Sequence, residues 1–304
     1  MSGADAGMLE ELRESAFAIA YRMLGRVAEA EDVVQETLLR VHRAFESGER
    51  IESPRAYAAT IATRLAIDEL RSVRARREAY VGEWLPEPIV TDPGQDPARQ
   101  AEMADSLSLA FLVLLERLTP EQRATLLLRD VFDYGYGEIA EMLGHTEASV
   151  RQLAVRARRQ VEEGRPRFTS SREQREELAR RFFAAAQEGD LGALESLLAE
   201  DVTLRGDGGG KAPALARALR GRSRVARTIR NWGRQAARVG AEFRFSRVNG
   251  QPGVRFLDSE GRLVSVIALE IDGGRIRSIS SIVNPDKLRH LGPVANLSAL
   301  LRRA

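Results

Sequence analysis

Apolar side chains recur at helical spacing through most of the first half of the chain. In residues 9–24 and 30–41 they return every three or four positions, which is the pattern of an amphipathic helix. Ser-Pro at 53–54 and Thr-Pro at 119–120 each predict a helix start, because the hydroxyl caps the first turn and proline fits its first position. A shorter helix is expected at 105–118. The first half is therefore predicted to be all-α.

This pattern breaks in two places and then changes character. Prolines among acidic residues indicate a linker at 81–104, and a Gly-Arg-Pro step before polar residues indicates a boundary near 164–172. One helix fits 173–188. Beyond 240 apolar and polar residues alternate, and 263–271 is apolar on both faces, as in a strand buried on two sides. The second half is predicted to be α+β.

Residues 136–155 fit a helix-turn-helix. Gly144 can adopt the positive φ that a tight turn needs, and the small Ala140 lets two helices cross closely. Thr146 is the expected N-cap of the second helix, and Val150 is expected to fill the space between the helices. An ordinary amphipathic hairpin with arginines on its wet side is the alternative interpretation.

The outward face of this second helix carries side chains suited to DNA. Arg151 and Gln152 have the paired hydrogen-bonding groups that read guanine and adenine edges in the major groove. Arg156, Arg158 and Arg159 suit phosphates. The pattern therefore predicts one base-reading face with a phosphate-binding end.

Composition excludes several classes of site. The 304 residues include no cysteine, and His42, His145 and His290 are far apart in the sequence. Disulfides and cysteine-based metal sites are excluded, and we expect no metal site and no cofactor. The chain has no apolar run long enough to span a bilayer and no secretion signal at its start. These features predict a cytoplasmic protein with no membrane partner.

Charge is unevenly spread. Residues 1–160 carry 20 basic and 27 acidic side chains, whereas residues 161–304 carry 26 basic and 17 acidic ones. An acidic half with local arginine clusters is typical of a protein that binds both another protein and DNA. The basic residues are nearly all arginine, and Lys211 and Lys287 are the only lysines.

A second basic cluster follows Lys211. From there to Arg238 the chain has nine basic side chains and no acid, and arginines from Arg217 to Arg234 recur at three or four positions. The spacing predicts one basic helix face. Such a face could simply be solvated, or it could contact nucleic acid or the acidic first half of the chain.

Three segments of the first half resemble, in order and spacing, the bacterial extracytoplasmic-function (ECF) sigma factors. Ala-Glu-Asp-Val-Val-Gln-Glu-Thr-Leu-Leu-Arg-Val at 30–41 resembles the helix of sigma region 2, and 53–57 and 66–71 continue that region. The helix-turn-helix then corresponds to region 4. The resemblance implies a factor that directs core RNA polymerase to promoter DNA, through the −10 and −35 elements, for transcription initiation.

The resemblance also implies surfaces within region 2. In the family the helix at 30–41 docks on RNA polymerase, which implies a polymerase-binding face made of Glu31, Asp32, Gln35 and Glu36. Simple solvation of these side chains is the alternative. Contacts to the −10 element are expected from Tyr57, Arg64, Arg71, Arg74, Arg76 and Arg77. A loop at 46–53 suits an unstacked base, because strand opening needs a flipped-out base held in a pocket. Tyr57 fits the core equally well.

Three further motifs resemble signatures of one subgroup, the SigJ-like ECF sigma factors with a fused C-terminal SnoaL-like domain. The motifs are Trp84, Leu85, Pro86, Glu87 and Pro88, then Asp207, Gly208, Gly209, Gly210 and Lys211, then Asn284, Pro285, Asp286, Lys287 and Leu288. In the subgroup this domain tunes activity, so no separate anti-sigma factor is required. The motifs are therefore expected to make regulatory interdomain contacts.

Two of these motifs have simpler interpretations. The glycine run is not a phosphate-binding Walker loop, because Arg205 stands where the first glycine belongs and Ala212 replaces the serine or threonine. A tight or flexible loop fits better. Trp84 with its prolines could be only a stiff linker with one anchored aromatic side chain, although docking against the C-terminal domain is the favoured prediction.

The implied fold is multidomain, with all-α sigma regions 2 and 4 followed by an α+β SnoaL/NTF2-like cone-shaped domain. The expected boundaries are region 2 at 1–80, a linker at 81–104, region 4 at 105–167, the SnoaL-like domain at 173–290 and a C-terminal tail at 291–304. Related folds include enzymes with an acid–base pair, but no histidine lies between 146 and 289. We expect no catalysis, and a small ligand of unknown identity is a candidate partner of the pocket.

Two other functions stay open. The first is a one-component helix-turn-helix regulator whose SnoaL-like pocket binds a small ligand. The second is an isomerase- or cyclase-like enzyme with an accessory DNA-binding module, and the missing histidine speaks against it. Copurification with core RNA polymerase distinguishes a sigma factor from both.

Overall fold

The computed structural model describes residues 3–78, 80–91, 107–162 and 170–302, and the side chains of residues 3–6 and 73–78 lie outside that description. By its contacts the chain divides into two units. We call Met1–Ala79 with Leu114–Arg165 the helical unit, and Tyr80–Val113 with Pro166–Ala304 the sheet unit. Residues 80–91, most of which were expected to belong to a linker, are therefore part of the sheet unit.

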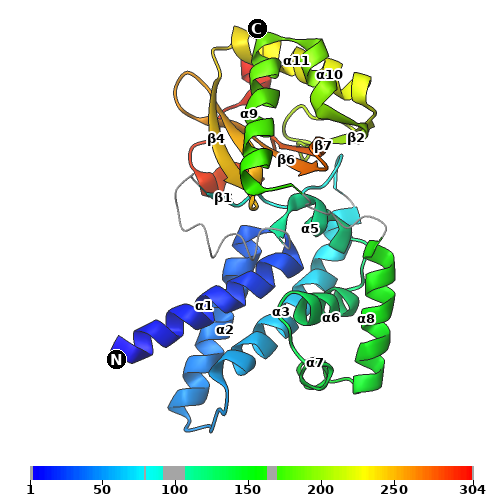
Figure 1. The fold of residues 1–304 in the computed structure, drawn as a ribbon. Coiled ribbons are helices and arrows are strands. Elements are labelled where there is room, and N and C mark those ends of the chain that lie inside the picture. The colour runs from blue at the N-terminus through cyan, green and yellow to red at the C-terminus, as the bar shows by residue number, and fades with distance from the viewer. Residues whose placement is uncertain (1–2, 79, 92–106, 163–169, 303–304) are drawn as a thin grey trace. The chain divides into compact units, whose positions relative to one another are not determined.

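The helical unit contains the predicted region 2 and most of the predicted region 4 (Figure 1). In the first of these, α1 packs on α2 and α3 around a small core that includes Leu12, Val41 and Ala58. The helices of this unit are α1 Gly3–Leu24, α2 Val27–Glu46, α3 Pro54–Glu78, α6 Pro120–Asp130, α7 Tyr136–Leu143 and α8 Glu147–Glu162. Helix α5, Leu109–Leu115, spans the boundary between the two units.

The predicted helix starts are confirmed by their caps. The Thr119 hydroxyl accepts a hydrogen bond from the Gln122 amide in a capping box, with Pro120 in the first turn. The Ser53 hydroxyl accepts from the Ala56 amide at 3.3 Å, directly before α3. These caps satisfy backbone amides that would otherwise have no partner at the helix start.

The sheet unit is built on a seven-stranded sheet in the order β1-β4-β5-β6-β7-β2-β3. All neighbouring strands are antiparallel except β2 and β7, which run parallel. The strands are β1 Val90–Thr91, β2 Leu198–Asp207, β3 Leu219–Arg220, β4 Glu242–Val248, β5 Gln251–Leu257, β6 Leu263–Asp272 and β7 Arg275–Ile282. The helices of this unit are α9 Arg172–Glu188, α10 Leu191–Leu197, α11 Arg222–Arg238, α12 Pro285–Leu288, the 3-10 helix η1 Arg289–Leu291 and α13 Leu297–Leu301.

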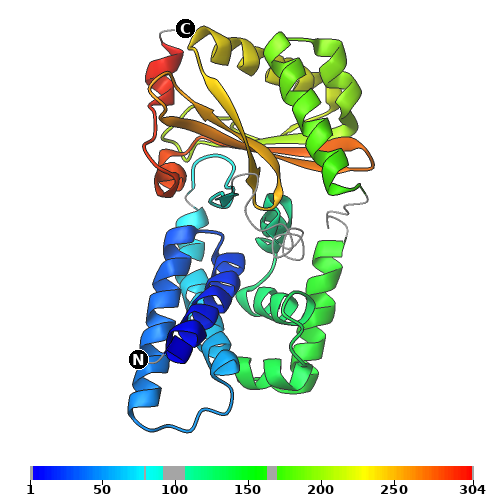
Figure 2. The same cartoon turned by 60° about the vertical axis from the view of Figure 1, so that its left-hand side comes forward.

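Both faces of this sheet are covered, which explains the strand that is apolar on two sides. Helices α9, α10 and α11 lie along one face (Figure 2), and Ile267, Leu269 and Ile271 of β6 join their apolar core. On the other face, Val266 and Ala268 pack in a second cluster with residues that include Leu85, Leu109 and Leu288. The prediction for 263–271 is confirmed, because successive side chains of a strand point to opposite faces.

Two sequence expectations need correction or extension. The basic face predicted from Arg217 to Arg234 does not lie on one helix. Helix α11 begins at Arg222, after Gly221 with φ +95°, so Arg217 and Arg220 precede it. The stretch expected as a C-terminal tail holds α13, and Val294 forms a bridge with Leu263 at the start of β6. The final described residues therefore belong to the fold of the sheet unit.

Candidate functional site

A fully buried carboxylate, Asp207, ends β2 and holds the segment that enters the sheet unit. Its Oδ1 accepts from the Tyr80 hydroxyl at 2.5 Å, and its Oδ2 accepts from the Leu85 amide at 2.7 Å and from Lys287 Nζ at 2.7 Å. A buried carboxylate is tolerated only when such donors replace water. We call residues 80–91 the strap, since these contacts fasten them to the sheet.

The ammonium of Lys287 is the second anchor of the strap. Its side chain is only 3% exposed, and besides Asp207 it donates to the Leu85 carbonyl. It also lies over the rings of Tyr80 and Trp84, at 4.9 and 4.4 Å from their centroids. A compact ammonium satisfies an anion, a carbonyl and two ring faces at once, which accounts for a lysine in an arginine-rich chain.

Asn284 completes the cluster at the start of α12. Its Nδ2 donates to the Tyr80 hydroxyl at 2.8 Å, and its Oδ1 accepts from the Asp286 amide, which caps the helix. A Cβ on Gly209, whose φ is +57°, would lie 2.2 Å from Asn284 Nδ2. Lys211 pairs with Asp286 at the more exposed side. The structure thus brings the three predicted motifs together within the sheet unit, so the stiff-linker interpretation of Trp84 is wrong.

The rest of the strap is held by side-chain contacts to its backbone and by pairing of its last strand. His290 Nε2 lies 2.9 Å from the Pro88 carbonyl, the Ile89 amide donates to Asn249 Oδ1, and β1 pairs with β4. Glu87 is 3% exposed. Tyr80 lies outside the predicted motif, and its only sequence signal is an aromatic ring close to Trp84.

The helix-turn-helix has the predicted geometry. Gly144 adopts φ +67° between α7 and α8, and the Thr146 hydroxyl accepts from the Ser149 amide at 3.2 Å. Val150, Ala154 and Ala157 of α8 are buried. The exposed residues of α8 include those predicted for DNA: Arg151, Gln152, Arg156, Arg158 and Arg159.

Two of these arginines already have acidic partners. Arg151 Nη2 lies 2.5 Å from Glu147 Oε1, and its guanidinium lies 4.5 Å from the centroid of the Tyr136 ring. Arg158 makes two hydrogen bonds to Asp130, and this bonding raises the pKa of Arg158. Binding of phosphate by Arg158 would compete with its structural role.

Two arginines of region 2 that were predicted to bind DNA, Arg64 and Arg71, have described side chains, and both contact region 4. Arg64 donates from Nε to the Met142 carbonyl at 2.7 Å and from Nη2 to the Glu141 carbonyl at 3.1 Å, at the end of α7. Arg71 Nη2 lies 2.6 Å from Glu121 Oε1 at the start of α6. The side chains of Arg74, Arg76 and Arg77 lie outside the described residues.

Charge explains the placement of these contacts. Carbonyls at a helix C-terminus attract cations, and a helix N-terminus favours an acid such as Glu121. Burial raises the pKa of Glu121, but hydrogen bonds that include the one from Arg71 outweigh it and leave that pKa below its ordinary value. Fully buried Arg22 also reaches region 4, 5.4 Å from the Phe132 ring centroid, and burial lowers its pKa to about 10. We call the contacts of Arg64 and Arg71 the latch.

The predicted polymerase face on α2 is only partly free. Asp32 and Gln35 are exposed, whereas Glu31 pairs with Arg13 at 2.8 Å and Glu36 pairs with Arg40 at 2.7 Å.

The structure bears on one of the two predicted roles of Tyr57, and its contact with the −10 element stays a prediction. It is half-buried and packs against the cluster of Leu12, Val41 and Ala58, so its ring belongs partly to the core. Residues 46–50, in the loop predicted to hold an unstacked base, are exposed.

Other site types receive no support from the described parts of the chain. They contain no group of three or more histidine, cysteine, aspartate or glutamate side chains that could hold a metal ion. No helix among them is both long and apolar enough to cross a bilayer.

Three family models match successive parts of the chain. Sigma-70 region 2 matches residues 8–77, Sigma-70 region 4 matches residues 108–161, and the SnoaL-like domain matches residues 179–279. These matches define a sigma-70-type transcription factor with a SnoaL-like domain after region 4.

Individual relatives narrow the class. The chain is 39% identical over 289 residues to the ECF RNA polymerase sigma factor SigJ of Mycobacterium tuberculosis, covering 91% of each. It is 33% identical to the probable ECF RNA polymerase sigma factor SigI of that species, covering 89% of this chain and 90% of SigI. The crystal structure of Mycobacterium tuberculosis SigJ matches with a TM-score of 0.75 and 36% identity, covering 93% of this chain and 98% of that one. The chain belongs to the ECF RNA polymerase sigma factors.

Proposed function

We propose that this protein directs core RNA polymerase to specific promoters and starts transcription there, with no catalytic group of its own. The observation that carries the proposal is the pairing of two sigma regions with an exposed recognition helix that presents Arg151 and Gln152. Its partners are core RNA polymerase and promoter DNA, which place its action in the cytoplasm. In vitro transcription with core polymerase on a genomic library tests the proposal.

The polymerase is proposed to bind the acidic face of α2. This face consists of Glu31, Asp32, Gln35 and Glu36. Asp32 is its most informative member because its side chain is exposed, whereas two neighbours have arginine partners within the chain.

Reversing the charge of Asp32 is expected to weaken the complex with core polymerase. Asp32→Arg places a cation in the acidic face that is proposed to bind polymerase, so we expect affinity to fall at least about tenfold. Copurification and titration with core enzyme measure this. Asp201→Arg, a reversal at an exposed site of the sheet unit, is the matched control. Equal binding of both variants would contradict the assigned surface, and no binding of the unmodified chain would favour a one-component regulator.

The DNA-binding residues are proposed to divide between two promoter elements. Region 4 would read the −35 element, and its contacts are Thr146, Arg151, Gln152, Arg156, Arg158 and Arg159. Region 2 would contact the −10 element through Tyr57, Arg64, Arg71, Arg74, Arg76 and Arg77.

Base reading and phosphate binding should respond differently to substitution. Arg151→Ala should cost about 1–3 kcal/mol at the correct −35 sequence and relax the preference at one base. Arg159→Ala should weaken all sequences alike and make the salt dependence shallower. Arg159 is a better choice than Arg158 for this test, because Arg158 also bonds to Asp130 and its loss could disturb the fold. Titrations on matched and mutated promoters check this, and identical specificity profiles for the two variants would refute the division.

We further propose that the SnoaL-like domain regulates the sigma regions through the chain that joins them. The joining segment is fastened to the sheet unit at both ends, by the strap and by Leu107 and Ala110, which bond to Asn249 and Glu270. A change in this fastening would change how closely the chain tethers region 2 to region 4. A bias of about 1.4 kcal/mol shifts such a balance tenfold. On this proposal no separate anti-sigma factor is required.

A further inference from the structure

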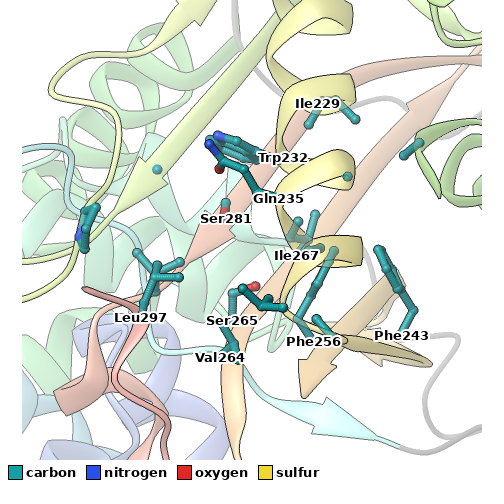
Figure 3. A pocket seen from close by; sticks show the side chains of 18 of the residues that line it. Ile229, Trp232, Gln235, Phe243, Phe256, Val264, Ser265, Ile267, Ser281 and Leu297 are labelled. Carbon is teal, nitrogen blue, oxygen red and sulfur yellow. The ribbon is translucent and has the colours of Figure 1, made fainter. Parts of the chain in front are cut away.

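The sheet unit contains a partly open cavity of about 340 Å³ that none of the three motifs lines. Its walls come from α9, α11 and the strands that they cover, and Leu297, Leu300 and Leu301 of α13 close one side (Figure 3). The volume lies at the lower end of pockets that hold small organic ligands, about 300–1,000 Å³. The space therefore fits a compact molecule.

The lining defines what that molecule can be. No acidic side chain, lysine, arginine or histidine is among the described residues that line the cavity. The rings of Trp232, Phe243 and Phe256 supply flat apolar walls. An ionised ligand would lose its hydration here without gaining a counter-charge, whereas a neutral ring compound loses little.

A few polar groups interrupt this apolar wall. Ser265 and Ser281 lie on β6 and β7, and Gln235 lies on α11 near them (Figure 3). Both serines are buried. Convergent polar groups in an apolar pocket fix the orientation of a ligand.

The cavity wall and the strap anchors are neighbours along two paired strands. Gly206 and Ser281 line the cavity and are register partners in β2 and β7, and Asp207 is the next residue of β2. Val283 lines the cavity directly before Asn284. Successive strand residues point to opposite faces of the sheet, so Gly206 lines the cavity while Asp207 points toward the strap. A displacement of the cavity wall would therefore also move Asp207 and Asn284, which hold Tyr80 and Leu85.

We propose that this cavity binds a neutral, largely apolar ring compound with one or two hydrogen-bonding groups, and that its occupancy changes how firmly the strap is held. The regulatory meaning of this coupling rests on the proposed function. The binding itself does not, because all its contacts lie within the sheet unit. Helix α13 is the natural entry side, since this five-residue helix has no buried residue of its own.

Two related probes test the ligand class on the full chain without polymerase. N-phenyl-1-naphthylamine is neutral and carries one N–H group, and 8-anilinonaphthalene-1-sulfonate has the same rings with an added anion. We expect saturable one-to-one binding of the neutral probe by fluorescence, and at least about tenfold weaker binding of the anion. Equal binding of both probes, or binding of neither, would overturn the ligand assignment.

Cavity-filling variants test the location. Ala236 lines the cavity from α11, whereas Ala237 beside it is exposed and lies outside the lining. Ala236→Phe should abolish binding of the neutral probe, and Ala237→Phe should leave it unchanged. Leu300→Trp, at the α13 side, gives a second blocking variant if Ala236→Phe fails to fold. Equal binding by both alanine variants would place the probe elsewhere and overturn the site.

Hydrogen–deuterium exchange tests the coupling. The neutral probe should change the exchange rate of the Leu85 amide, which bonds to Asp207, at least about threefold, and Ala236→Phe should remove that change. Binding without any change in the strap would overturn the coupling and leave the ligand site standing. Because no readout uses transcription, failure of the sigma-factor function would be seen separately.

Discussion

Replacing Lys287 by alanine is expected to lower the free energy of unfolding of the sheet unit by about 3–5 kcal/mol, because the substitution leaves a buried carboxylate without its cation. Lys287 and Asp207 have side-chain exposures of 3% and 0%. Asp207 would keep only the Tyr80 hydroxyl and the Leu85 amide as donors. Denaturant unfolding followed by tryptophan fluorescence reports on this unit alone, because both tryptophans of the chain, Trp84 and Trp232, lie in it.

Lys211 supplies the matched control. It pairs with Asp286, but their side chains are 57% and 31% exposed, so Lys211→Ala should cost no more than about 1 kcal/mol. Equal losses of unfolding free energy in the two alanine variants would show that burial of the Lys287–Asp207 pair adds nothing to the stability of the sheet unit. If the strap regulates the sigma regions, Lys287→Ala should also change promoter-dependent transcription at temperatures where the sheet unit stays folded, and Lys211→Ala should not.

Local sequence signals predicted the helical unit well. Ser53, Thr119 and Thr146 cap helices, and Gly144 turns between them with positive φ, because each of these preferences acts over only a few residues. The periodicity of α8 likewise separated buried from exposed residues. Such signals do not depend on distant parts of the chain.

The strap shows where local signals fail. Its prolines and acids are typical of a linker, yet Leu85 is fully buried. The donors and acceptors that hold it, Asp207 and Lys287, follow 122 and 202 residues later. Without the structure, only the resemblance to known family motifs indicated that these distant segments belong together. Tyr80, which belongs to no motif, was missed for the same reason.

The prediction of one basic helix face failed for a different reason. Arginines from Arg217 to Arg234 continue a helical spacing across Gly221, but the glycine adopts φ +95° and the helix starts after it. Spacing alone cannot show where a helix starts, whereas a glycine that can take positive φ often marks such a break. The cavity depends on side chains from several elements, so the resemblance to SnoaL-like domains implied a pocket but the sequence did not show which residues line it.

Loss of the latch is expected to separate regions 2 and 4. Arg64→Ala removes two charge-assisted hydrogen bonds to the end of α7, and with allowance for partial exposure we expect a cost of about 1–2 kcal/mol, or about 5–30-fold in the balance between joined and separated regions. The chain has no cysteine, so Leu39→Cys in α2 and Val155→Cys in α8, both exposed, offer unique sites for two dyes. Energy transfer between them should fall in Arg64→Ala.

Glu121→Gln separates the latch from DNA binding, because it breaks the ion pair with Arg71 but leaves Arg71 available for its proposed contact with the −10 element. The pKa of Glu121 is below its ordinary value, so its contribution is present at neutral pH and is lost as pH falls through that lowered pKa. At neutral pH we expect Glu121→Gln to lower energy transfer and to raise promoter affinity by up to about fivefold.

Arg64→Ala should lower energy transfer without that gain, since Arg64 is itself proposed to contact DNA. Glu147→Gln, which breaks the pair with Arg151 inside region 4, should leave energy transfer unchanged. If Glu121→Gln matches the unmodified chain in both energy transfer and promoter binding, the latch does not keep Arg64 and Arg71 from the DNA contacts proposed for them.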